Sequence, residues 1–122
     1  MGLDMYFGKK EKGSTEIQEV GYWRKANHIH NWFVQKVQNG VDECQNSQVS
    51  KDQMKELLAE CKAIVENPTE AAKRLPTQSG FFFGGVEYDE WYMEDIAKTI
   101  DILERELNIS DDETEYFYQS SW

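Results

Sequence analysis

Residues 19–37, EVGYWRKANHIHNWFVQKV, constrain the fold more than any other stretch of the chain. At about 100° per residue, its apolar side chains recur on one side, which is typical of an amphipathic helix. We therefore predict a helix from Gly21 to Asn39 that turns this side toward the core. His30 lies at the edge of that side, where we interpret it as a hydrogen-bonded packing residue. The apolar side consists of Tyr22, Ala26, Ile29, Phe33 and Val37, with Trp23 at its edge.

The opposite side of this predicted helix is polar, and it offers a fixed cation, amides and an imidazole. Two interpretations stay open. The stripe is either solvated helix surface, because charged and amide side chains are mostly exposed, or a face that recognises a ligand. Trp32 lies off the apolar side, so it either packs beneath another element or stands exposed. The polar residues are Arg24, Asn27, His28, Asn31 and Gln35.

The rest of the chain divides into short segments at its Gly, Pro and Asn residues. The clearest boundary is Ser50 with Gln53 three residues later, a capping box that begins a helix ending before Pro68. Residues 41–48 are polar and predict a loop. The other predicted elements are strands at 3–7, 16–20 and 81–83, a helical turn to about Arg74, a helix at about 89–107, and a last strand from Tyr116 to Trp122.

This pattern predicts an α+β fold, with a small, mostly antiparallel sheet packed by three helices. A chain of 122 residues fits a single domain spanning 1–122. The segment TQSGFFFGG, residues 77–85, has two interpretations. Its phenylalanines form either a strand in the middle of the sheet or a platform of rings on which a flat ligand stacks. The candidate ligand-binding residues are therefore Arg24, Asn27, His28, Asn31, Phe82 and Tyr88.

Negative charge is concentrated in the last third of the chain. Residues 85–122 hold twelve acids and two bases, which accounts for the whole net charge of −10. This balance argues against direct binding of nucleic acid, whose phosphates require Lys and Arg. It favours either an ordinary solvated face or a surface that binds a partner with a basic surface. The candidate partner-binding residues are Glu90, Trp91, Glu94, Asp101 and Glu104, and we expect Ile102 to add exposed apolar area beside them.

Catalytic and metal-binding patterns are weak. His28 and His30 diverge by about 200° on a helix, so they cannot ligate one metal together. Cys44 and Cys61 are interpreted as free thiols, with Cys61 in the core. We predict no cofactor, no metal and no catalytic residue. The best catalytic constellation that the sequence offers is Arg24 and His28 facing Glu87 and Asp89, which is a hypothesis about proximity.

Three segments together resemble a family of small bacteriophage and prophage proteins without an established activity. These segments are MGLDMY, EVGYWRKANHIHNWFV and LPTQSGFFFGGVEYDEWY, and they cover most of the chain with the second helix between them. The resemblance implies a phage accessory protein. No apolar run approaches the length of a membrane span, so we expect it to act in the host cytoplasm. Small phage proteins of this kind often act on host proteins, including restriction and CRISPR defence, so an anti-CRISPR role is an expectation of the resemblance.

Three functions remain open from the sequence. The first is a phage protein that binds a host macromolecule through the acidic third, of which nucleic-acid mimicry is a narrower version. The second is a module that binds or sequesters a small ligand or nucleotide, using the polar stripe and the FFFGG and EYDEWY rings. The third is an enzyme acting on nucleotides, which would need a concave pocket with perturbed titratable groups. A homodimer is an open alternative.

Overall fold

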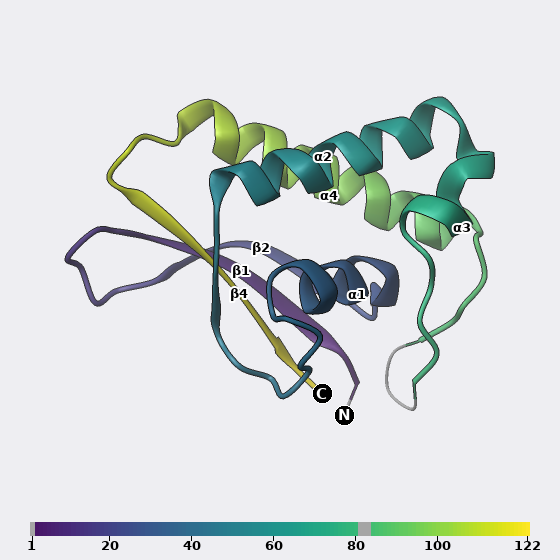
Figure 1. Ribbon diagram of the computed structural model, residues 1–122, viewed down its shortest axis with the longest axis horizontal. Coiled ribbons are helices and arrows are strands. Elements are labelled where there is room, and N and C mark those ends of the chain that lie inside the picture. The colour runs from purple at the N-terminus through teal and green to yellow at the C-terminus, as the bar shows by residue number, and fades with distance from the viewer. Residues whose placement is uncertain (1, 81–83) are drawn as a thin grey trace.

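A four-stranded antiparallel sheet in the order β2-β1-β4-β3 forms one layer of the computed structural model (Figure 1), which describes residues 2–80 and 84–122. The helices cover one face of this sheet, as the predicted α+β class requires. The elements are β1 (Asp4–Glu11), β2 (Gln18–Arg24), α1 (Asn27–Lys36), β3 (Ser47–Val49), α2 (Lys51–Glu66), the 3₁₀ turn η1 (Pro68–Glu70), α3 (Ala71–Arg74), α4 (Glu90–Ile109) and β4 (Thr114–Ser121).

Helix α1 begins later than the sequence predicts. Tyr22, Trp23 and Arg24 belong to β2, where they pair with β1, and the helix starts only at Asn27. In β2, burial alternates with period two, so Trp23 is buried while Tyr22 is partly exposed and Arg24 exposed. A short segment whose apolar residues recur both at the helical spacing of three to four residues and at the strand spacing of two fits a helix or a strand equally well. Pairing with β1 decides in favour of the strand, and Lys25 at φ 58° turns the chain into α1.

Aromatic rings form the contact between the sheet and α1. Phe33 of α1 stacks on Tyr118 of β4 with a centroid distance of 3.9 Å and an interplanar angle of 5°. Phe7 of β1 stacks on Tyr116 at 5.5 Å, and Trp23 contacts Phe33 at 6.1 Å. All five rings are buried. Stacked and tilted aromatic pairs stabilise a core beyond the area they bury, so this layer fixes how α1 lies on the sheet.

The fourth strand of the sheet is a segment that the sequence predicts as a loop. β3 pairs with β4 through Val49, Gln48 and Ser47. The strand predicted at 81–83 lies outside the described residues, and the described residues flanking it, 77–80 and 84–88, form no strand. β3 was missed because it is three residues long and mostly polar, and an edge strand of that length leaves no periodic signal.

The two long helices agree with their sequence signals. Ser50 caps α2, accepting a hydrogen bond from the Gln53 amide while the Gln53 side chain accepts one from Ser50 N, so the capping box is confirmed. Cys61 is buried in α2 and Cys44 is partly exposed, both as free thiols. The expectation that Ile102 is exposed was wrong. Ile102 is only 4% exposed, because Gly21 of β2 has no side chain and leaves room for it.

Gly21→Val should destabilise the fold by about 1–3 kcal/mol, the usual cost of overpacking a core. A Cβ atom at Gly21 would lie 3.0 Å from Ile102 Cδ1 and 3.3 Å from Phe7 Cβ, so α4 would have to move away from the sheet. Urea unfolding measures the effect. Gly85→Val is the control, since an added Cβ there meets nothing within 4 Å, and equal destabilisation by both variants would contradict this packing account.

Candidate functional site at the start of α4

The Asn27 side chain joins the first turn of α1 to the segment that connects α3 with α4. Its Nδ2 donates to the Gly85 carbonyl at 2.7 Å, and its Oδ1 accepts from the Gln78 amide at 2.8 Å. The side chain is therefore a bridge to both arms of this segment. Asn27 is 2% exposed, so at this position the polar stripe is not solvated helix surface.

Further contacts hold the same segment in shape. Thr77 Oγ1 donates to the Val86 carbonyl at 2.8 Å, and the Thr77 amide donates to Tyr88 Oη at 3.1 Å. Gly84, at φ 84°, lies directly against Lys25, and a Cβ atom there would lie 3.0 Å from Lys25 Cβ. Only glycine permits both this conformation and this approach. The described residues of this segment on either side of 81–83 are thus held in place by these contacts.

The segment, the β2–α1 turn and the first turns of α4 enclose a pocket of about 340 Å³. We call it the α4 pocket. Its size is at the lower end of the range for sites that bind small molecules or single side chains. Figure 1 shows α4 beginning beside α3, with this connecting segment passing below both. The lining residues are Arg24, Lys25, Asn27, His28, Thr77, Gly84, Gly85, Glu87, Asp89, Trp91, Tyr92, Glu94 and Asp95.

Four carboxylates and two basic side chains line the α4 pocket. Within the described part of the chain, none of these carboxylates makes an ion pair, whereas Glu104, Glu106 and Glu115 further on are all paired. Burial raises the pKa of Asp95 to about 6, opposed by Lys98 and reinforced by its acidic neighbours. A positive charge placed next to a carboxyl group in this environment stabilises its ionised form.

Arg24 does not neutralise these acids, because it is engaged elsewhere. Its guanidinium pairs with Asp4 on β1 at 2.8 Å, and Tyr22 donates a short hydrogen bond to the same carboxylate. The Tyr22 hydrogen bond and the Arg24 charge hold the pKa of Asp4 below its usual value. Lys25 is the basic lining residue without an ion pair in the described part of the chain. The pocket is therefore predominantly acidic.

His28 forms a buried part of the wall. It is 3% exposed, and its ring stacks on Tyr92 at 4.0 Å. Burial lowers the pKa of His28 to about 4, so the imidazole is neutral at physiological pH. Tyr92 in turn donates to the Leu75 carbonyl at 2.7 Å, and the N-cap Asp89 accepts from the Tyr92 amide at 3.1 Å. The start of α4 is thereby tied to both α1 and α3.

The structure brings the two predicted sites together in part. Arg24, Asn27 and His28 line the same pocket as Trp91 and Glu94. The hypothetical constellation of Arg24, His28, Glu87 and Asp89 also surrounds this pocket, although Arg24 is paired with Asp4. Lys25, Thr77 and Asp95 were missed. Asp95 had a signal, because it lies one helical turn after Trp91.

Other predicted residues lie apart from the α4 pocket. Asp101 and Glu104 line a different, open depression near the end of α4, and Glu104 pairs with Lys62 at 2.8 Å. Asn31 lines a separate pocket between α1 and α3. Tyr88 holds the connecting segment through Thr77. Phe82 lies outside the described residues. The five predicted partner-binding residues of α4 are therefore divided, with Glu90, Trp91 and Glu94 at one end.

Comparison with protein-family models, curated proteins and solved structures finds no match to this chain. Among the described residues, no group of three or more His, Cys, Asp or Glu side chains is placed to hold a metal ion. No helix in the described part of the chain has the length and apolar character needed to cross a membrane.

Asn27→Ala should destabilise the fold by about 1–3 kcal/mol, because the Gly85 carbonyl and the Gln78 amide lose their hydrogen-bond partner. It should also speed hydrogen exchange at the Gln78 amide, which loses its acceptor. Asn31→Ala is the matched control, since the Asn31 side chain makes no hydrogen bond within the described residues. Unfolding curves and amide exchange measure both variants. Unchanged protection of Gln78 in Asn27→Ala would contradict the bridging role.

Proposed function

We propose that this chain is a phage accessory protein that binds a basic segment of a host protein, with one Lys or Arg side chain entering the α4 pocket. The role is one of binding, not catalysis. The observation that carries the proposal is the set of unpaired carboxylates at this pocket, from Glu87 to Asp95. A protein that gathers uncompensated acids around a concave site favours a cationic occupant over a phosphate-bearing one.

Trp91 supports a macromolecular partner. It is 68% exposed at the pocket rim, between the exposed acids Glu90 and Glu94. A large exposed ring beside unpaired charge is typical of an interface anchor, and an indole face attracts an ammonium or guanidinium group. The partner's cation would thus meet carboxylates inside the pocket and the Trp91 ring at its mouth. Trp91→Ala should weaken binding by about tenfold or more.

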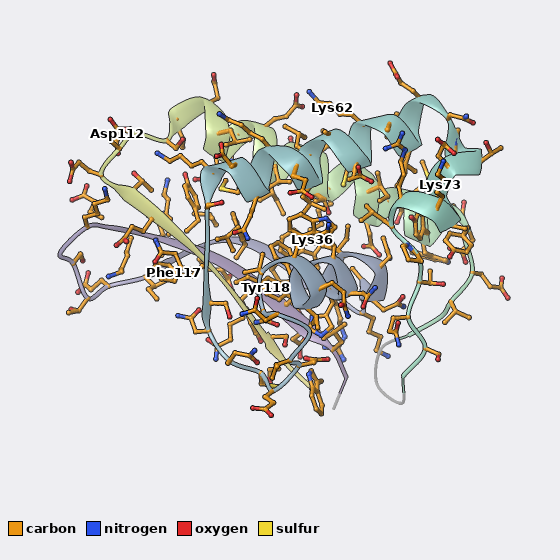
Figure 2. All side chains as sticks on the ribbon, viewed as in Figure 1. Lys36, Lys62, Lys73, Asp112, Phe117 and Tyr118 are labelled. Atoms are coloured by element: carbon orange, nitrogen blue, oxygen red, sulfur yellow. The ribbon has the colours of Figure 1, made fainter. Side chains whose placement is uncertain are left out.

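Capture of the partner should depend on where the acids lie and not on total charge. Tagged protein carrying Glu87→Gln with Glu94→Gln should lose its partner in a low-salt capture from host lysate analysed by mass spectrometry. Asp112→Asn with Glu113→Gln removes the same charge at the far end of α4, where Figure 2 labels Asp112, and should retain the partner. Equal loss by both double variants would show only a net-charge effect, and no capture by the wild type would remove the proposal's main support.

Binding of a cation should also tighten as the pH rises from 5 to 7.5. Asp95, with its pKa raised to about 6, is mostly protonated at pH 5 and ionised at pH 7.5, and a bound cation favours the ionised form. The affinity for a blocked peptide of alternating arginine and glycine should rise by up to about tenfold over this range. His28, with a pKa of about 4, stays neutral throughout.

Calorimetry with Asp95→Asn checks the assignment of this pH dependence. The variant should bind the peptide more weakly at pH 7.5 and show little change in affinity between pH 5 and 7.5. Asp112→Asn provides the control for loss of one carboxylate outside the pocket. An undiminished pH dependence in Asp95→Asn, or tighter binding at pH 5 by the wild type, would contradict a cation seated beside Asp95.

A further inference from the structure

A second pocket, of about 200 Å³, lies between α1 and α3 on the other side of His28. We call it the α1–α3 pocket. It is lined by the part of the polar stripe that remains accessible, Asn31 and Gln35, and by residues at the end of α3. The full lining is His28, Asn31, Trp32, Gln35, Lys36, Arg74, Leu75 and Pro76. Amides one helical turn apart on α1 therefore face a wall of α3 and the residues that follow it.

Two buried nitrogens without hydrogen-bond partners belong to residues that line this pocket. They are Nε of Arg74 and Nε2 of His28. The two terminal nitrogens of Arg74 pair with Glu60 at 3.3 Å and with Glu70 at 3.6 Å. These pairs fix the guanidinium, while Nε has no hydrogen-bond partner. Nε of arginine always carries a hydrogen and can only donate. A buried donor without an acceptor is costly. Because this nitrogen has almost no exposed surface, a ligand in the pocket cannot reach it, and the Arg74 guanidinium is a fixed part of the wall.

The charged and apolar residues of the lining restrict the chemical class of the ligand further. Of the described residues that line the pocket, those with a formal charge are both cationic, Lys36 and Arg74. The Lys36 pair with Glu56 is long, at 3.6 Å, and both side chains are about half exposed. Trp32, Leu75 and Pro76 contribute apolar surface to the lining. A lining that combines amide donors, cationic side chains and apolar surface suits a ligand with an anionic group and a compact apolar body.

We infer that the α1–α3 pocket is a binding site for a small carboxylate with a compact apolar or aromatic body. The Asn31 and Gln35 amides donate to the carboxylate, and Lys36 supplies a positive charge. This site is separate from the acidic α4 pocket, and the formally charged residues of its lining, Lys36 and Arg74, are cationic. This inference does not depend on whether the α4 pocket binds a basic segment.

Benzoate and benzamidine test this inference as probes of similar shape and opposite charge. With ¹⁵N-labelled protein at constant ionic strength, benzoate should shift the backbone amide signals of residues 28–36 and 74–75 in a saturable way. Benzamidine should leave these signals in place. No shift with benzoate, equal shifts with both probes, or benzoate shifts centred on residues 84–95 would each overturn the assignment.

Two lysines provide a matched pair of variants, both labelled in Figure 2. Lys36→Gln removes a charge from the pocket rim and should weaken benzoate binding at least about threefold. Lys73→Gln removes the same charge from α3, outside this lining, and should leave benzoate binding unchanged. Asn31→Leu, which removes an amide and preserves bulk, should weaken binding at least about fivefold. Wild-type affinity in both Lys36→Gln and Asn31→Leu would overturn the inference.

Discussion

The Asn27 bridge is the interaction on which the arrangement of the functional surface depends. One buried amide fixes Gly85 and Gln78, so the connection between α3 and α4 is held against the first turn of α1. A side-chain amide can donate and accept at once, and this property lets a single residue restrain both arms of the segment. Without the bridge, the wall of the α4 pocket would lose the two hydrogen bonds that hold Gln78 and Gly85 to α1.

His28 is the second element of this construction, because it lines both pockets. Its burial keeps the imidazole neutral, and its ring lies against Tyr92. An acidic pocket and a pocket whose charged lining residues are cationic thus share one uncharged wall. Burying a cationic histidine there would cost free energy. The neutral His28 ring avoids this cost and adds no charge to either pocket.

The sequence predicted the fold class, the limits of α2 and the core side of α4, because each rests on a local signal: the Ser50 capping box, Pro68, and a long apolar period in α4. The sequence did not predict features that depend on contacts between residues far apart in the chain. The end of β2 at Arg24 depends on its register with β1, and the burial of Ile102 depends on the missing side chain of Gly21. Of the site, Glu94 and Trp91 were predicted from charge and periodicity. The buried roles of Asn27 and His28 follow from contacts with residues fifty or more positions away, which no local pattern reveals.

The most direct test of the central claim, that the start of α4 takes up a cationic side chain, is an NMR titration with N-acetyl-arginine amide. This probe carries one guanidinium and no other charge, so it reports the pocket without the rest of a partner. The account predicts saturable shifts confined to the amides of residues 24–28 and 84–95 and to the Trp91 indole. Shifts spread along residues 101–115, or no saturable shift at all, would contradict it.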